Sequence, residues 1–373
     1  MKQRYIESLG CSLPLLGFGG MRLPLLEDKK IDYPLAKKMV DYALANGVDY
    51  FDTAYMYLDS QSEPFFGEAL AEYPRDSYRL TSKMPAAWLK QEGDQERIFA
   101  EQLARCKVDY FDFYLLHAVS KKSLAAARQF GTIPFLLKMK EEGKIRHLGF
   151  SFHDDEDCLR ETIAEAPWEF VQLQLNYYDY ELGEAKRLYE IACEAKLPIF
   201  VMEPVRGGFL SDMPEEAQEI LHKANPAKST AAFALEWVAE LPGVAMMLSG
   251  MSNFEQVTEN VATLSDFEAV PPVEKRAVEE CAKFLAAYKT VPCTGCRYCM
   301  PCPAGVKIPE TFQIYNDYKL LKNATGAKNS YAEIAPENRA TACVNCRKCM
   351  NTCPQHLEIP TLLAQAHEEL AQL

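Results

Sequence analysis

The chain has 373 residues, of which 48% are hydrophobic and 25% charged, and its formal net charge is −13. This length suits one large domain and a smaller one, and the composition is that of a soluble globular protein. The negative charge argues against binding to nucleic acid or to anionic membranes. No stretch approaches the roughly 20 apolar residues of a membrane span, and the N-terminus opens no apolar run. We therefore expect a cytoplasmic protein without a membrane anchor.

From about residue 15 to 265, short apolar runs alternate with amphipathic helical stretches. The predicted helices include 33–46 and 133–142, each followed by a glycine that signals a helix end, as well as 184–196 and 230–241. Eight runs that are rich in β-branched and aromatic residues and bounded by Gly, Asp or Pro are predicted strands. They are 15–22, 48–53, 78–84, 111–117, 145–152, 170–177, 198–203 and 244–249.

Eight strands that alternate with helices at spacings of about 30 residues predict an α/β fold, a (β/α)₈ TIM barrel over residues 1–270. An open doubly wound sheet is the structural alternative. The chain has no Gly-x-Gly-x-x-Gly after an early strand, which favours the barrel. Residues 5–13 precede the first barrel strand and are expected to form a hairpin that closes the barrel floor.

The pattern changes at Pro271-Pro272, which interrupts the chain. Residues 273–289 have the period of an amphipathic helix, so we expect residues 271–290 to link two domains. Residues 291–373 then form a small, mainly helical domain. Its helical stretches, 310–321 and 330–334, lie between two cysteine-rich runs.

Eight of the 13 cysteines occur in these two runs, and both runs end in Cys-Pro. The first run contains Cys293, Cys296, Cys299 and Cys302, and the second contains Cys343, Cys346, Cys349 and Cys353. Three cysteines at this spacing followed by Cys-Pro are the bacterial ferredoxin pattern for a [4Fe–4S] cluster. Two runs therefore predict two 4Fe-4S clusters and a chain that moves single electrons. So many cysteines in a chain without an export signal suit a reducing cytoplasm.

The cysteines have two alternative interpretations. Zinc ribbons use Cys-x-x-Cys pairs, but two pairs suffice for zinc and the remaining cysteines would be unexplained. A disulfide scaffold does not suit the enzyme-like remainder of the chain. In two-cluster ferredoxins the fourth cysteine of each run binds the other cluster, so Cys353 would join the first run and Cys302 the second. Only Met300 and Pro301 precede Cys302, one residue fewer than usual, which leaves its role open.

A second set of polar residues follows the predicted strands. Strands 48–53, 78–84 and 111–117 end near Asp52, Lys83 and His117, and Tyr57 follows Asp52 closely. Active sites of TIM barrels lie at the C-terminal ends of their strands, so these four side chains are expected to meet. An ammonium beside a phenol favours the phenolate, and a carboxylate holds the ammonium in place. Each residue type taken singly is more often structural, but the four together suit proton transfer to a carbonyl oxygen.

The same segment carries a family resemblance. Asp52-Thr53-Ala54-x-x-Tyr57, followed by Ser62-Glu63 and Gly67-Glu68-Ala69-Leu70, resembles the signature of the aldo-keto reductases, and the match extends over roughly residues 1–265. With the C-terminal cysteine runs, the chain resembles the branch of this family that has a ferredoxin-type domain. The resemblance implies that Tyr57 is the general acid, that Asp52 and Lys83 tune it, and that His117 positions the carbonyl.

The resemblance also implies contacts to a nicotinamide cofactor, NAD(H) or NADP(H). The matching residues are Ser151, Gln174, Glu259 and Asn260. Phe152 and Met202 replace residues that family members use at the nicotinamide end. Gly250 and Gln256 stand where family members carry basic residues for a 2′-phosphate. Because Arg or Lys is the expected partner of that phosphate, a strong preference for NADP is not predicted.

We therefore expect an iron–sulfur oxidoreductase that reduces a small carbonyl substrate or oxidises an alcohol. The electrons for this reaction are expected to come from a nicotinamide cofactor, to pass through the two 4Fe-4S clusters, or both. We also expect a redox partner protein. A hydride carries two electrons and a cluster moves one, yet no flavin motif is evident. Two alternatives stay open: an electron-transfer protein whose barrel no longer binds nicotinamide, and an enzyme whose clusters are purely structural.

Overall fold

The computed structural model describes residues 1–288 and 290–373, which form two compact units. The first unit contains Met1–Val205 and Ala231–Lys275. The second contains Arg206–Thr230 and Arg276–Leu373, and so combines an internal segment with the C-terminal residues.

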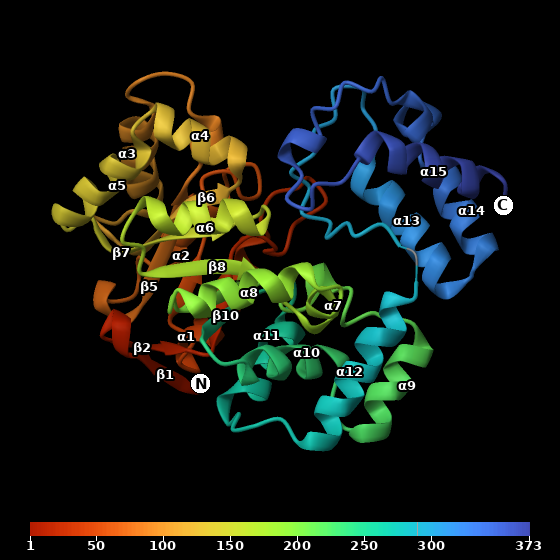
Figure 1. Ribbon diagram of the computed structural model, residues 1–373, viewed down its shortest axis with the longest axis horizontal. Coiled ribbons are helices and arrows are strands. Elements are labelled where there is room, and N and C mark those ends of the chain that lie inside the picture. The colour runs from red at the N-terminus through yellow and green to blue at the C-terminus, as the bar shows by residue number, and fades with distance from the viewer. Residues whose placement is uncertain (289) are drawn as a thin grey trace. The chain divides into compact units, whose positions relative to one another are not determined.

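The first unit is a closed barrel of parallel strands in the order β10-β3-β4-β5-β6-β7-β8-β9, which confirms the predicted TIM barrel (Figure 1). Each predicted strand overlaps one of these. β3, β4 and β8 are shorter than predicted, because the residues after Gly19, Asp52 and Gln174 leave the ladder. The strands are β3 (Leu16–Gly19), β4 (Tyr50–Asp52), β5 (Arg79–Met84), β6 (Phe111–Val119), β7 (Ile145–Phe152), β8 (Phe170–Gln174), β9 (Ile199–Met202) and β10 (Val244–Gly250).

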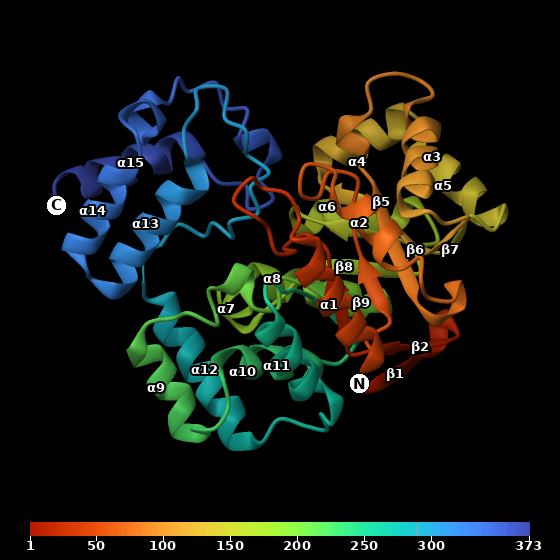
Figure 2. The ribbon, with the colours of Figure 1, turned by 180° about the vertical axis from the view of Figure 1, so that it is seen from behind.

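Helices surround these strands (Figures 1 and 2). Side chains at two helix starts explain where those helices begin: Asp32 accepts a hydrogen bond from the Leu35 N–H at 3.2 Å, and Ser120 and Ser123 form a capping box. The helices are α1 (Tyr33–Ala45), α2 (Ser62–Ala69), α3 (Asp94–Cys106), α4 (Lys121–Gln129), α5 (Thr132–Glu141), α6 (Glu156–Glu165), α7 (Tyr177–Glu181), α8 (Glu184–Glu194), α10 (Thr230–Glu240) and α11 (Phe254–Ser265).

An antiparallel hairpin, β1 (Gln3–Ile6) and β2 (Cys11–Pro14), precedes the barrel. Leu9 and Leu13 belong to one apolar cluster with Tyr50 and Phe113, which point into the barrel. Arg4 donates a hydrogen bond to the carbonyl oxygen of Val244, the first residue of β10. The hairpin therefore covers the N-terminal ends of the strands, and the functional candidates lie at the opposite ends.

The second unit is mainly helical and consists of α9 (Glu215–Ala224), most of α12 (Pro272–Ala286), α13 (Ile308–Leu321), α14 (Ala324–Glu333) and α15 (Ile359–Ala371). Helices α13, α14 and α15 pack side by side (Figures 1 and 2), around buried residues such as Phe312, Tyr331 and Leu363. The cysteine runs occupy the loops before α13 and before α15. Residue 289, within the predicted linking segment 271–290, lies outside the described residues.

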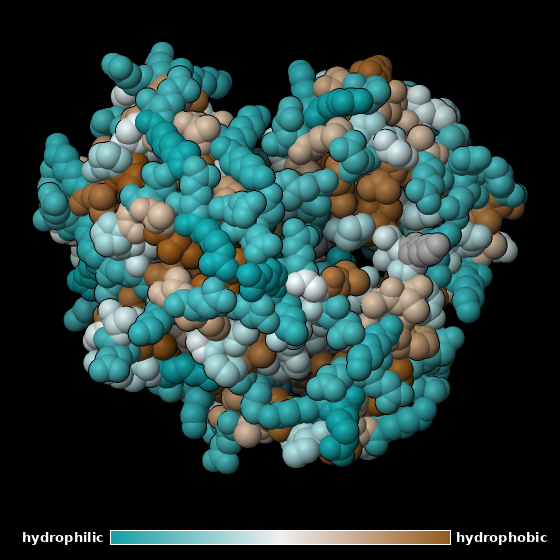
Figure 3. All heavy atoms as spheres, viewed as in Figure 1, coloured by the Kyte–Doolittle hydropathy of each residue, from teal (hydrophilic) through white to brown (hydrophobic). Residues whose placement is uncertain are grey.

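Hydrophilic residues predominate on the face drawn in Figure 3, where hydrophobic residues occur in small groups. Within the described ranges, no helix is both long enough and apolar enough to cross a membrane.

Candidate active site and cysteine pockets

The four residues predicted to act on a carbonyl lie at the C-terminal ends of neighbouring strands. Asp52 ends β4, Lys83 lies in β5, His117 lies in β6, and Tyr57 follows β4. Lys83 Nζ lies 2.5 Å from Asp52 Oδ1, 3.2 Å from the Tyr57 hydroxyl and 2.8 Å from the Thr53 carbonyl oxygen. The Tyr57 and His117 rings have centroids 5.9 Å apart and an interplanar angle of 78°. The ammonium is therefore shared between a carboxylate and a phenol, and an imidazole flanks the phenol.

Burial sets the protonation of this group. The Lys83 and Asp52 side chains are 1% and 4% exposed. Burial lowers the pKa of Lys83 and raises that of Asp52, and the attraction between the two residues opposes both shifts. Burial also holds the pKa of His117 well below its ordinary value, and Lys83 and His153 add to that shift. His117 is therefore neutral near pH 7, and a neutral imidazole donates one N–H.

The turn after Tyr57 has an unusual backbone. Leu58, Asp59 and Ser60 have φ angles of 53°, 54° and 66°, in the left-handed region. Residues with a Cβ atom adopt this region at an energetic cost, and such residues are enriched at functional sites. The Ser60 hydroxyl donates to the Tyr55 carbonyl oxygen at 2.8 Å. This bond ties the turn to the segment before Tyr57 and so restrains the tyrosine.

A buried polar network behind Lys83 was not predicted from the sequence. Gln102 Nε2 of α3 lies within hydrogen-bond distance of Glu63 Oε1 and Ser82 Oγ, both at 2.7 Å, and of the Lys83 carbonyl oxygen at 3.0 Å. Glu63 also pairs with Arg105 at 3.3 Å, and its charge opposes the lowering of the Lys83 pKa. The motif had identified Glu63, but only the folded barrel shows that Gln102 joins it to the backbone of Lys83.

Two of the predicted cofactor contacts have partners within the protein. Ser151 of β7 is buried, and its hydroxyl oxygen accepts a hydrogen bond from the Ala118 N–H at 2.8 Å. Ala118 has a φ of 48° and directly follows His117, so Ser151 restrains the backbone that carries the imidazole. Gln174 at the end of β8 donates to Asp179 Oδ2 at 2.7 Å. Each residue therefore has a structural role within the protein.

The other two predicted cofactor contacts lie in α11, after β10. Asn260 is buried and donates to Ser249 Oγ at 3.1 Å, whereas Glu259 is exposed. Gln256 Oε1 accepts a hydrogen bond from the Ser252 N–H at 2.7 Å. The neutral Gln256 side chain therefore contributes to the start of α11, and Asn260 fixes the end of β10.

A cation that the sequence analysis did not identify lies beside Gly250. A Cβ atom added at Gly250 would lie 3.0–3.1 Å from three carbons of Arg22, so the arginine fills the space above this glycine. Arg22 Nη2 lies 3.0 Å from Glu203 Oε1. Arg22 follows β3 and Glu203 follows β9, and both strands neighbour β10. The ion pair therefore spans the C-terminal end of β10.

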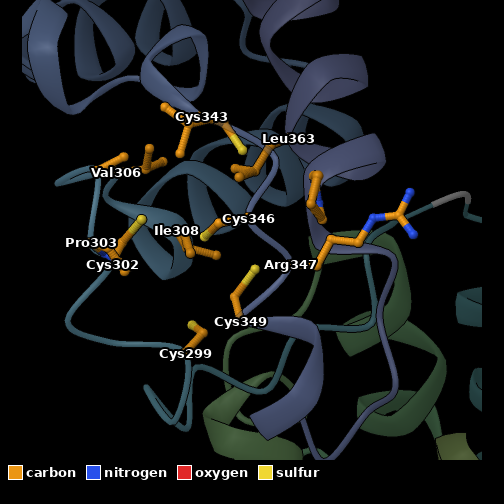
Figure 4. Close-up of a pocket in the computed structure, with 13 residues that line it drawn as sticks. Cys299, Cys302, Pro303, Val306, Ile308, Cys343, Cys346, Arg347, Cys349 and Leu363 are labelled. Carbon is orange, nitrogen blue, oxygen red and sulfur yellow. The ribbon is translucent and has the colours of Figure 1, made fainter.

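The cysteines of the two runs line two pockets in the second unit. The first pocket is lined by Cys293, Cys296, Cys299 and Cys353, with Ile308, Phe312 and Leu357 among its apolar residues. The second pocket is lined by Cys302, Cys343, Cys346 and Cys349, and Cys299 also borders it (Figure 4). The fourth cysteine of each run thus lies with the other run.

Interactions between the thiols give the same grouping. Burial raises the pKa of Cys299 to about 12, and Cys353 of the second run is among the thiols that add to the shift. Burial likewise raises the pKa of Cys349, and Cys302 of the first run contributes. Cys302 therefore lies close to the second run despite the shorter gap before it.

The arrangement of the cysteines differs from that of a site for a single metal ion. A zinc ion would draw its four ligands to about 2.0–2.3 Å from one point. Among the described residues, no group of three or more His, Cys, Asp or Glu could hold one metal ion. Thiolates that bind different iron atoms of one cluster lie farther apart. Four cysteines per pocket are also the ligand number of a [4Fe–4S] cluster.

The second cysteine run repeats the backbone of the first. Gly295 and Arg297 both have a φ of 65°, and the equivalent Asn345 and Arg347 have φ angles of 51° and 59°. An Ile-Pro pair then opens α13 after the first run and α15 after the second. The two pockets are therefore built from two copies of one local structure.

Two family models match the chain. The model of the aldo/keto reductase family matches residues 15–283. The model of a 4Fe-4S dicluster domain matches residues 292–358, which include all eight cysteines of the two runs.

Known proteins resemble the barrel part of the chain. The L-galactose dehydrogenase of Arabidopsis thaliana is 25% identical over 292 residues, which cover 72% of this chain and 89% of that protein. The holo form of an aldo-keto reductase from Bacillus halodurans has a TM-score of 0.63 at 24% identity and covers 77% of this chain and 97% of that one. An aldo-keto reductase from Klebsiella pneumoniae in complex with NADPH has a TM-score of 0.61 at 22% identity and covers 75% and 95%. These structures share the fold of the barrel.

Proposed function

The chain belongs to the aldo/keto reductase family, and on this premise we propose that it interconverts a small carbonyl compound and its alcohol, with Tyr57 as general acid and base. The observation that carries the proposal is the 3.2 Å contact between the Tyr57 hydroxyl and Lys83 Nζ. An ammonium at this distance stabilises the phenolate, which makes the phenol a better proton donor to a carbonyl oxygen. Asp52, 2.5 Å from Lys83, keeps the ammonium in place.

His117 is proposed to orient the substrate. Because burial keeps the imidazole neutral, it donates a hydrogen bond to the carbonyl oxygen without adding a positive charge. The imidazole and the phenol flank one position, so one oxygen can receive a hydrogen bond from His117 and a proton from Tyr57. In alcohol oxidation, the Tyr57 phenolate takes that proton back.

A nicotinamide cofactor, when bound, supplies the hydride. The family and the NADPH complex of the Klebsiella relative support this cofactor. Ser151 and Gln174 are proposed to hold the carboxamide, and Glu259 and Asn260 the adenosine end. A hydroxyl that accepts one hydrogen bond can still donate another, so the bond from Ala118 to Ser151 does not prevent this contact.

The dicluster domain is proposed to hold two [4Fe–4S] clusters, which when bound supply single electrons. One ligand set is Cys293, Cys296, Cys299 and Cys353, and the other is Cys302, Cys343, Cys346 and Cys349. The lining of the two pockets supports this exchange of the fourth cysteines.

A second candidate function is electron transfer by a protein whose barrel does not use nicotinamide. Met202 at the end of β9 offers no aromatic ring for stacking on a nicotinamide. In addition, Gln174 is bonded to Asp179, and Arg22 is paired with Glu203. If a cofactor bound beside them, Gln174 and Arg22 would either exchange these partners for the cofactor or contact both.

One experiment separates the two functions. The protein is purified without oxygen, and oxidation of NADH and NADPH is followed with a panel of small aldehydes and ketones. EPR spectra of the same samples report reduction of the clusters. The proposed function predicts nucleotide oxidation that depends on a carbonyl compound. Failure of every carbonyl to oxidise either nucleotide, with clusters that dithionite alone reduces, would support electron transfer instead.

A further inference from the structure

We propose that the loop 344–348, at the pocket of the second cysteine run, is the docking surface for a small acidic protein that carries one electron. This inference rests on the proposed function in one respect, namely that the pockets hold [4Fe–4S] clusters. Beyond the proposed function, the inference identifies the pocket that exchanges electrons with a partner protein and the charge of that partner.

The loop is open to solvent along its whole length. All five residues from 344 to 348 are exposed, and Val344 is 69% exposed. Of the eight cysteines in the two runs, Cys346 alone is exposed, and the other seven are partly buried. Electron transfer weakens steeply with distance, so a partner that contacts this loop would lie as close as possible to the centre that Cys346 helps to hold.

The loop also carries two cations. Neither Arg347 nor Lys348 forms an ion pair with any residue that the structure describes, and the Arg347 side chain extends away from the pocket (Figure 4). The chain as a whole has a net charge of −13, so a positive loop beside a redox pocket departs from the general charge of the protein.

Comparison with the first cysteine run shows how this charge arises. Arg297 occupies the position equivalent to Arg347, with the same left-handed backbone, but it pairs with Glu310 at 2.8 Å. Glu310 follows the Ile-Pro pair that opens α13. The residue that follows the Ile-Pro pair of α15 is Thr361, which has no charge. The second copy of the repeat therefore lacks the carboxylate that neutralises the arginine in the first.

An acidic one-electron carrier fits this surface. Opposite charges steer diffusional encounters and fix their orientation, and small contacts with apolar centres and charged rims are typical of transient redox complexes. Val344 would supply the apolar centre, and Arg347 and Lys348 the charged rim. In each encounter the carrier is oxidised by one electron and the bound centre is reduced by one, and no bond is made or broken.

The test uses the iron-loaded protein and, as probe, a reduced plant-type [2Fe–2S] ferredoxin. Stopped-flow absorption measures the second-order rate of electron transfer at low and high ionic strength. At low ionic strength the Arg347→Gln/Lys348→Gln variant should react about tenfold more slowly than the wild type, and the difference should shrink in high salt. Arg297→Gln is the matched control and should leave the rate unchanged, and Arg347→Lys should retain most of it.

Two further measurements distinguish a lost docking surface from a damaged cluster. Each variant should retain its iron and its rate of reduction by the cationic viologen radical, which does not need a positive docking surface. A double variant that reacts with ferredoxin as fast as the wild type, with the same salt dependence, would overturn the proposal. Carbonyl turnover does not enter the assay, so the proposed barrel chemistry can fail without affecting it. If the wild-type protein contained no iron, the pockets would hold no clusters, and the docking proposal would be wrong as well.

Discussion

Lys83 Nζ lies 2.5 Å from Asp52 Oδ1 at a place where the two side chains are 1% and 4% exposed. Removing two such charges from water costs several kcal/mol each, and the attraction between them offsets this only when the geometry is good. The pair is therefore a weak source of stability. Its position 3.2 Å from the Tyr57 hydroxyl instead suits it to holding an ammonium beside a proton donor.

We therefore predict that removing both charges of the Asp52–Lys83 pair abolishes activity but changes the free energy of unfolding only slightly. Lys83→Met leaves Asp52 buried without its partner, and should lower the free energy of unfolding by about 3–5 kcal/mol. The double variant Asp52→Leu/Lys83→Met removes both charges and should recover most of that loss while staying inactive. All three tryptophans lie in the barrel unit, so tryptophan fluorescence in denaturant follows its unfolding. A double variant as unstable as Lys83→Met would contradict this view of the pair.

The Arg22–Glu203 ion pair predicts the nucleotide preference. Positions 250 and 256 offer no cation, and Arg22 is already paired with Glu203, so NADH should bind at least as tightly as NADPH. Glu203→Gln releases Arg22 and should improve NADPH binding relative to NADH by about tenfold, the size of one charge-assisted hydrogen bond. Fluorescence titrations measure both affinities, and Arg22→Gln/Glu203→Gln is the control that should show no gain. A clear NADPH preference in the wild type would be inconsistent with this prediction.

The exchange of the fourth cysteines predicts which variants lose the same cluster. Cys302→Ala and Cys346→Ala belong to different runs but line one pocket, so both should lose about half of the iron and the same EPR signal. Cys353→Ala should remove the other signal. Cys281→Ala, at a buried cysteine outside the runs, is the control and should keep all the iron. Full iron content in Cys302→Ala would show that Cys302 is not a ligand.

A half-buried ion pair on the barrel predicts how stability depends on pH. His147 Nδ1 lies 3.0 Å from Glu169 Oε1. Burial alone would lower the pKa of His147, but hydrogen bonds to Cys11 and Glu169 outweigh it and raise the pKa to about 9. Because this value exceeds the roughly 6.5 of an unfolded histidine, the stabilisation is complete below about pH 6.5 and disappears as the pH rises through about 9.

Hydrogen bonds from His147, Lys140 and the Leu148 N–H lower the pKa of Glu169 to about 2 despite burial, so the contribution of Glu169 to stability is lost only as the pH falls toward that value. The free energy of unfolding of the barrel should therefore decrease between about pH 6.5 and 9. His147→Gln should flatten this decrease, as measured by denaturant unfolding at several pH values. Identical pH dependence in the two proteins would refute the assignment.

The sequence predicted those features that depend on local pattern. The eight strands and the cysteine spacing are local patterns, and so the sequence predicts all of them, although β3, β4 and β8 end earlier than predicted. Gln102 and the Arg22–Glu203 pair were missed because their partners lie far away along the chain. Gly250 shows the difference most clearly: the sequence indicates only that no cation stands at position 250, whereas the fold brings Arg22 from the loop after β3 into the space beside it. Likewise, only the fold shows that the Ser151 hydroxyl restrains Ala118, the residue after His117.

The most direct test of the proposed chemistry is the turnover of Tyr57→Phe. This variant keeps the ring and its packing but removes the hydroxyl that lies 3.2 Å from Lys83 Nζ. We predict that kcat for reduction of the best carbonyl substrate falls about 10²–10⁴-fold, while nucleotide affinity, iron content and the free energy of unfolding stay at wild-type values. A variant that retains the wild-type kcat would contradict the assignment of Tyr57 as general acid and base.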